Sequence, residues 1–254
     1  MTDPILRTQD LTVRFGGHVA VDAVSCAFQA GELTAIVGPN GAGKTTYFNL
    51  ISGQIPATGG KVFLRGRDLA GMSASQRTKA GIGRAFQLTN LFPDLTVLEN
   101  VRLVVQSHSG QGFNLWSMAS KHTELTEAAQ AVLERVRLAD LAGQVVSELS
   151  HGNQRKLEVA LLIALDPAVY MFDEPTAGMS VDEAPVVLDL IADLKAQSDR
   201  TILLVEHKMD VIRTLADRII VLHNGELAAD GPPAEVMASD VVQEAYMGKE
   251  LEDV

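Results

Sequence analysis

The 254-residue chain has a single cysteine and no long hydrophobic run, so it lacks the features of disulfide-bonded secreted proteins and of membrane-spanning proteins. Its one cysteine, Cys26, excludes an intramolecular disulfide and a cysteine-rich zinc site, so we expect a small buried apolar residue there. The N-terminal residues carry an early acid and no long apolar segment, unlike a secretory signal. No apolar run approaches the ~20 residues needed to cross a bilayer. We therefore expect a soluble chain, and if it works at a membrane another subunit must cross it.

Positive charge is also scarce. There are 21 Lys and Arg residues against 32 Asp and Glu residues, which gives a formal net charge of −11. This balance argues against a protein that binds nucleic-acid phosphates over a broad face, so we predict no nucleic-acid partner. The 46% of hydrophobic and 21% of charged residues are ordinary values for a folded protein and exclude a disordered chain.

Two parts of the chain read as α/β, and a helical part lies between them. Strands are predicted over 11–15, 33–37, 61–64, 168–172, 201–205 and 218–222, with a hairpin at 224–225 that returns over 226–229. Helices are predicted over 45–51, 96–105, 123–136 and 152–165. We expect one domain over 1–254, with 1–87 and 168–254 forming an α/β core and 88–167 a helical subdomain. The late strands are continuous apolar runs, typical of parallel strands buried on both faces.

A glycine-rich segment follows the strand over 33–37 and matches the phosphate-binding pattern G-x-x-x-x-G-K-[ST]. Glycine lets backbone N–H groups approach a polyphosphate closely, and the following helix would point its N-terminus at the same anion. Lys44 would reach the β- and γ-phosphates, and the Thr45 hydroxyl would ligate Mg²⁺. The alternative is a glycine-rich turn with an incidental lysine. The segment consists of Gly38, Pro39, Asn40, Gly41, Ala42, Gly43, Lys44, Thr45 and Thr46.

The strand over 168–172 delivers two acids, Asp173 and Glu174, at its carboxyl end, which is the edge where open α/β sheets bind ligands. Asp173 is suited to hold Mg²⁺ through water. Glu174 could orient or deprotonate a water for attack on the γ-phosphate. The alternative is that the two acids cap a following helix.

Five further elements lie in a defined order around these two motifs. The hexapeptide Leu-Ser-His-Gly-Asn-Gln at 149–154 places Ser150 23 residues before Asp173. The others are Phe15 at the end of the first strand, Gln87 after the segment 82–86, Ala-Gly-Met-Ser at 177–180, and His207 after the strand over 201–205. With this order and spacing the chain resembles the ATPase subunit of an ATP-binding cassette (ABC) transporter over essentially its whole length.

The resemblance implies a P-loop NTPase (RecA-like) α/β core, an N-terminal antiparallel β subdomain and a helical subdomain that carries the signature sequence at 149–154. It implies ATP and Mg²⁺ as cofactors, with Phe15 stacking on adenine. Gln87 would sense the nucleotide and contact Mg²⁺, while His207 would hold Glu174, the attacking water and the γ-phosphate in register. Residues Ser150, His151, Gly152 and Asn153 would bind ATP held by a second subunit. Taken singly, Phe15 could instead belong to the core, Gln87 to a plain loop, and His207 to a helix cap.

Narrower resemblance points to the branched-chain and hydrophobic amino acid uptake branch. It is carried by the segments 81–87, 91–93, 95–101, 205–210 and 246–248, and by the extra segment 106–122. In that branch the ATPase pairs with a paralogous ATPase subunit beneath transmembrane permease subunits, which a periplasmic solute-binding protein feeds. The chain would then lie at the cytoplasmic face of a bacterial inner membrane. A urea or short-amide importer, a lipopolysaccharide-type exporter and a soluble non-transport ABC ATPase remain alternatives.

His151 stands where the family signature has its first glycine, and Asn153 stands in place of its glutamine. We predict that His151→Gly leaves ATP binding intact, because Ser150 and Gly152, which are expected to approach the γ-phosphate, are unchanged. Titration of the purified variant with a fluorescent ATP analogue checks this. Loss of nucleotide binding would show that the role given to this position is wrong.

Overall fold

The computed structural model describes residues 3–85, 91–109, 118–196 and 200–239, without the side chains of 118–122, and divides the chain into two compact units. The first unit comprises Met1–Ile82, Ala168–Glu174 and Leu194–Val254. The second comprises Gly83–Pro167 and Pro175–Asp193. The predicted boundaries of the core and the helical subdomain stay a prediction.

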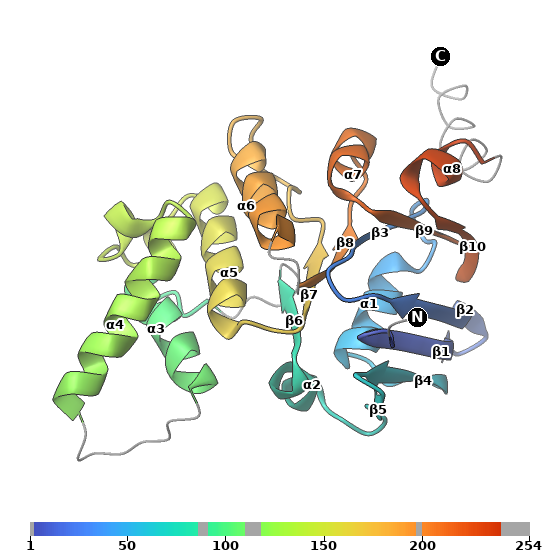
Figure 1. The fold of residues 1–254 in the computed structure, drawn as a ribbon, viewed down its shortest axis with the longest axis horizontal. Helices are drawn as coiled ribbons and strands as arrows, with labels where there is room; N and C mark the ends of the chain where they lie inside the picture. Colours follow the sequence, from blue (N-terminus) through green and yellow to red (C-terminus); the bar gives the residue numbers. More distant parts are fainter. Residues whose placement is uncertain (1–2, 86–90, 110–117, 197–199, 240–254) are drawn as a thin grey trace. The chain divides into compact units, whose positions relative to one another are not determined.

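The first unit is built on a six-stranded sheet with the order β10-β9-β3-β8-β7-β6, of which β6 contributes its first residue, Ile82, to this unit (Figure 1). The strands are β3 (Leu33–Val37), β6 (Ile82–Ala85), β7 (Val169–Asp173), β8 (Thr201–Val205), β9 (Arg218–His223) and β10 (Glu226–Gly231). β9, β3, β8 and β7 pair in parallel, and β10 returns antiparallel to β9. Every residue of β3, β7 and β8 is buried, so the prediction of parallel strands buried on both faces is confirmed.

A four-stranded antiparallel sheet with the order β2-β1-β4-β5 completes the strands of this unit. The strands are β1 (Leu6–Phe15), β2 (His18–Phe28), β4 (Gly59–Leu64) and β5 (Arg67–Asp68). The sequence pattern did not reveal β2. The pairing of β2 with β1 shifts register several times, and Asp10 and Ala23 have positive φ. Because of these irregularities, buried and exposed side chains do not alternate strictly along β2, and the sequence lacks the usual strand pattern. The predicted α/β class with an antiparallel β part is confirmed.

Helix α1 (Lys44–Ser52) follows β3 and buries Tyr47, Phe48, Leu50 and Ile51 in the main core. Cys26 also lies in this core, 5% exposed, and burial raises the pKa of its thiol to about 11, as its apolar interpretation requires. On the other face of the large sheet, α7 (Met209–Leu215) and α8 (Pro233–Met237) contribute Ile212 and Val236 to a second cluster.

Helix α2 (Ala74–Ala80) supports the end of α1. Its polar sequence, Ala-Ser-Gln-Arg-Thr-Lys-Ala, has no apolar periodicity and gave no helix prediction. The Arg77 guanidinium is buried and donates to the carbonyl oxygens of Leu50 (2.7 Å), Ile51 (2.8 Å) and Leu69 (3.3 Å). A cation at this position adds a charged donor to carbonyls at the C-terminal end of α1, where the helix dipole also favours positive charge.

The second unit contains α3 (Val97–His108), α4 (Met118–Arg135) and α5 (His151–Leu165), which contact one another pairwise, and two 3₁₀ turns, η1 (Ala139–Leu141) and η2 (Val146–Glu148). α6 (Ala184–Ala196) begins in this unit and ends in the first. Buried Asn100 of α3 accepts from the N–H of Phe92 (2.9 Å) and donates to its carbonyl (3.2 Å). Within the ranges that the structure describes, no helix is both long and apolar enough to span a membrane.

Arg77→Met should destabilise the chain by about 2–4 kcal/mol, because three buried carbonyl groups lose a charged donor. The measurement is the free energy of unfolding from a denaturant titration. Arg67→Met serves as the control, since Arg67 is exposed, and should change stability by no more than about 0.5 kcal/mol. Equal stability of the two variants would show that Arg77 does not support α1.

Candidate nucleotide-binding and hydrolysis site

The loop between β3 and α1 wraps around the ammonium group of its own lysine. Lys44 donates from Nζ to the carbonyl oxygens of Gly38 (2.7 Å) and Pro39 (3.0 Å). Gly38, Gly41 and Gly43 have φ angles of +150°, +83° and +96°, a region that favours glycine. The loop therefore offers a glycine-lined backbone turn, followed directly by a helix N-terminus, and this arrangement fits a polyphosphate.

Segments remote in sequence hold this loop. A Cβ atom on Gly38 would overlap the carbonyl oxygen of Leu222 in β9, and one on Gly43 would lie 2.5 Å from the carbonyl oxygen of Ala20 in β2. Gly225, in the turn between β9 and β10, donates its N–H to a carbonyl of the loop (3.1 Å). The Asn-Gly pair correctly predicted the turn at 224–225, but nothing in the sequence indicated that this turn contacts the phosphate loop. The contact from Ala20 was not predicted either, because β2 was not predicted.

Two carboxylates stand near this lysine, at and just after the carboxyl end of β7. Asp173 is 6% exposed, and Glu174 follows with φ +51°. Burial lowers the pKa of Lys44, while the negative charges of Glu174 and Asp173 oppose that shift. The Asp173 carboxylate and the hydroxyl of Thr45, the second residue of α1, are oxygen donors of the kind that Mg²⁺ prefers, so the donor set fits this ion.

Glu174 is paired with the histidine that follows β8. Nε2 of His207 lies 2.8 Å from Oε1 of Glu174, and both side chains are about 40% exposed. The backbone N–H of Glu174 donates to the carbonyl of Val205 (2.9 Å), which joins the ends of β7 and β8. His207 does not cap α7, whose N-cap is Lys208, so the helix-cap alternative is wrong. Likewise Asp173 and Glu174 do not cap the next helix, which starts at Ala184.

Glu206 also supports this pair and was missed from the sequence. Its side chain is 3% exposed, and its carboxylate accepts the backbone N–H of His207 (3.0 Å). An acid directly after the apolar run over 201–205 was the available signal. This buried carboxylate fixes the backbone from which His207 reaches Glu174.

Phe15 ends β1 and is 53% exposed, so the alternative that it belongs to the core is wrong. Phe15 pairs with His18 across the β1–β2 hairpin. Two residues after His18, Ala20 contacts the phosphate loop. This register brings Phe15 to the end of the antiparallel sheet that lies against the phosphate loop.

The signature residues occupy the N-terminal end of α5 in the second unit. Ser150 is the N-cap, and its Oγ accepts the N–H of Asn153 (3.2 Å). Ser150 and His151 are exposed, Asn153 is half-buried and Gly152 is buried. The helix end is therefore open to a ligand from outside its own unit. Gln87 lies outside the described residues, as do residues 110–117 of the segment 106–122.

An apolar groove of about 450 Å³ runs beside α3 and α5 in the second unit. Its walls include Leu103 and Val104 of α3, Leu161 and Leu165 of α5, and Phe92, which is 52% exposed. The four aliphatic side chains are half-buried and Phe92 is exposed, so the groove offers partly accessible apolar surface that suits a binding partner.

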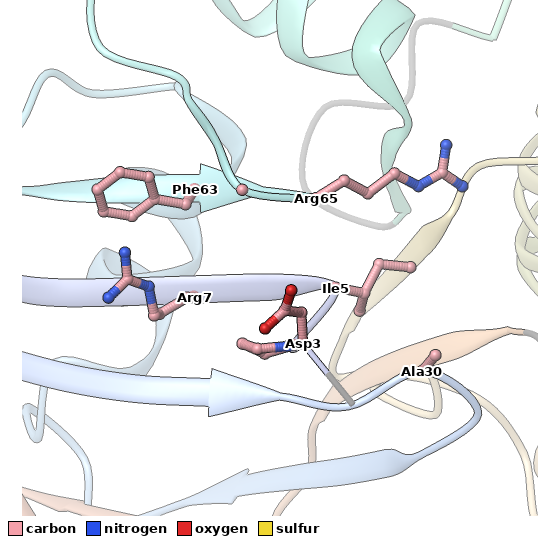
Figure 2. Close-up of a pocket in the computed structure, with 8 residues that line it drawn as sticks. Asp3, Ile5, Arg7, Ala30, Phe63 and Arg65 are labelled. Atoms are coloured by element: carbon pink, nitrogen blue, oxygen red, sulfur yellow. The ribbon is translucent and has the colours of Figure 1, made fainter. Parts of the chain in front are cut away.

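A different hollow, on the antiparallel sheet, contains none of the predicted site residues (Figure 2). There the Arg7 guanidinium lies over the Phe63 ring, 4.3 Å from its centre. Figure 2 shows the side chains of Arg7 and Arg65 extending in opposite directions, so they do not converge on one anion.

Comparison with known proteins agrees with this geometry. The family model for ABC transporters matches residues 21–177, and a model described as "Branched-chain amino acid ATP-binding cassette transporter" matches residues 226–252. The chain is 38% identical to the high-affinity branched-chain amino acid transport ATP-binding protein LivG of Salmonella typhimurium, covering 98% of this chain and 100% of LivG. It is 34% identical to BraF of Pseudomonas aeruginosa, with 98% and 100% covered.

Solved structures of ABC cassettes also match this chain over most of its length. The ADP conformation of an ATP-binding cassette of an ABC transporter superposes with a TM-score of 0.82 at 30% identity, covering 97% of this chain and 100% of the other. A dimeric post-hydrolysis cassette bound to ADP and Pi gives 0.77 at 26% identity, covering 90% and 98%. The chain therefore belongs to the ABC transporter family. It is a nucleotide-binding ATPase with the P-loop NTPase fold of that family.

Lys44→Ala should abolish useful ATP binding, since it removes the cation that the loop encloses. The measurement is equilibrium binding of ATP to the purified chain. Lys61→Ala is the matched control, because Lys61 is exposed and pairs with Asp68 (2.9 Å), and it should bind ATP normally. Normal affinity of the Lys44 variant would refute the phosphate-loop assignment.

Proposed function

We propose that this chain powers the uptake of branched-chain and other hydrophobic amino acids as an ATPase subunit of an ABC importer. The observation that carries the proposal is the match of residues 226–252 to the model of the branched-chain amino acid cassettes. The relatives named for branched-chain amino acid transport, which this chain covers over their full length, support it.

The phosphate loop and its surroundings would hold the nucleotide. Backbone N–H groups of residues 38–46 and the ammonium group of Lys44 would bind the phosphates, and Phe15 would stack on adenine. Thr45, Asp173 and Gln87 would hold Mg²⁺, which when bound neutralises charge on the phosphates. The partial burial that lowers the pKa of Lys44 also keeps its charge close to the ligand with little screening by water.

Glu174 would act as the general base. Its carboxylate would accept the proton of the attacking water, and His207 would keep that carboxylate in place through the 2.8 Å contact. Glu206 would in turn fix the backbone of His207. The three residues would therefore have separate roles, because Glu174 accepts the proton, His207 orients the acceptor, and Glu206 holds the orienting residue.

A second ATPase subunit, a paralogue in this branch, would complete the site. Ser150 lies at an exposed helix N-terminus with the buried Gly152 in its first turn, and the N–H groups and dipole of this helix end favour a phosphate. In the proposed arrangement this end of α5 meets the γ-phosphate of ATP held by the partner. His151 and Asn153 would line the same end.

Transmembrane permease subunits would dock on the apolar groove beside α3 and α5. A short amphipathic segment of the permease fits such a groove, because its apolar side chains would cover Leu103, Leu161 and Phe92. The chain would then be peripheral to the cytoplasmic face of the inner membrane, with a periplasmic solute-binding protein on the far side. We also propose the single cassette domain over 1–254 with the boundaries given above.

Transport measured with the chain assembled with its membrane subunits in liposomes distinguishes the candidate solutes. Liposomes should accumulate labelled leucine when ATP is present on the cassette side and loaded solute-binding protein on the other. Stimulation of ATP hydrolysis by urea or a short amide instead, or extraction of a lipid, would overturn the assignment of solute and favour the alternatives above.

Glu174→Gln should bind ATP and lose roughly 10²-fold or more in turnover, the scale of a positioned general base. Phosphate release by the assembled transporter and ATP binding by the isolated chain are the two measurements. Glu226→Gln, an exposed acid in β10, is the control and should turn over normally. Unchanged turnover in the Glu174 variant would remove Glu174 from the role of base.

A further inference from the structure

The first turn of α5 rests on an acidic side chain from the start of α6. Both elements belong to the second unit at this point. Gly152 is buried, and a Cβ atom built on it would overlap the carboxyl group of Glu183, with Oε2 only 2.6 Å away. Gly152 has ordinary helical φ, so its backbone conformation does not call for glycine, and a side chain at this position would instead displace the carboxyl end of Glu183.

Glu183 is itself held in one orientation by reciprocal hydrogen bonds with Ser180. The backbone N–H and the hydroxyl of Ser180 donate to Oε2 of Glu183 (3.4 and 3.1 Å), and the N–H of Glu183 donates to the Ser180 hydroxyl (3.3 Å). These are the reciprocal bonds of a capping box, formed in the turn of residues 181–183 directly before α6. Ser180 ends the segment 177–180, which follows Glu174 closely in the chain, so this turn also sets where Glu183 meets the signature turn.

The charge of Glu183 adds a second effect. In the described part of the chain its hydrogen bonds go to Ser180, and no basic side chain pairs with it. The carboxylate lies at the positive end of α5, which favours it electrostatically. A phosphate group arriving at the same end of the helix would meet this negative charge.

We infer that Glu183 is a positioning residue for the signature sequence. Its carboxyl group fixes the turn that contains Gly152, and its charge weakens the attraction between α5 and the phosphate of the partner's ATP. The inference rests on the proposed function, in which Ser150 and Gly152 meet that phosphate. Glu183 thus keeps the phosphate-binding turn rigid while limiting how tightly it retains nucleotide.

The contact can be tested without ATP, from the thermal stability of the full chain. Ala normally stabilises a helix relative to Gly. Gly152→Ala should displace the Glu183 carboxylate from its hydrogen bonds with Ser180 and so lower Tm, and it should no longer lower Tm in the Glu183→Ala background, which lacks that carboxylate. The same loss of Tm in both backgrounds would overturn the contact.

The role in catalysis is tested in the assembled transporter with Glu183→Gln and Glu183→Ala. Glu183→Gln keeps the shape and the acceptor for Ser180 but removes the charge, so KM for ATP should fall by about 3- to 10-fold while kcat changes by less than about 2-fold. Glu183→Ala also loses the support of the turn, so kcat should fall by about 5-fold or more, a loss that Glu183→Gln restores.

Asp189→Asn is the matched control. Asp189 is an exposed acid on the same helix, and its neutralisation should leave both kinetic constants unchanged. An unchanged KM in Glu183→Gln, or an equal shift in Asp189→Asn, would overturn the inference. The proposed function fails separately, if the transporter carrying Glu174→Gln keeps its turnover.

Discussion

The site depends on how closely three backbone segments approach the phosphate loop. Gly38 lies against the carbonyl of Leu222, and Gly43 against the carbonyl of Ala20, and neither position has room for a side chain. Gly225 adds a hydrogen bond from the β9–β10 turn. The shape of the loop is therefore imposed by strands from both sheets of the first unit. This explains how a short glycine-rich turn, flexible in isolation, is held ready for a polyanion without a penalty for ordering it on binding.

Charge in the site is balanced around one partly buried lysine. Burial disfavours the charged form of Lys44, and the carboxylates at and after the end of β7 favour it. Of these carboxylates, Asp173 is buried, whereas Glu174 is partly exposed and directed to His207. Two neighbouring acids in different environments suit different roles, the first as a ligand of a cation and the second as an acceptor of a proton.

In the second unit two of the signature residues are exposed to solvent, whereas the phosphate loop of the first unit is held by other segments. Ser150 and His151 are exposed at the start of α5, whereas the turn behind them is fixed by the contact between Gly152 and Glu183. An exposed helix N-terminus on a rigid base is suited to a ligand carried by another subunit. The apolar groove beside α3 and α5 lies in the same unit, and it is where we propose that the membrane subunits dock.

The sequence by itself determined the class of fold, the glycine-rich loop after β3, the two carboxylates at and just after the end of β7, and the position of His207, since each belongs to a local pattern of strand, turn and helix. It also fixed β3 and β8 to the residue, because continuous apolar runs mark strands buried on both faces. It did not find β2, where bulges break the alternation, or α2, whose stabilising residue Arg77 acts through carbonyls of another helix. Only the tertiary structure brought Ala20 to the loop and Glu183 against Gly152. These contacts join residues whose chemistry becomes specific only when distant segments pack together, and no local spacing records them.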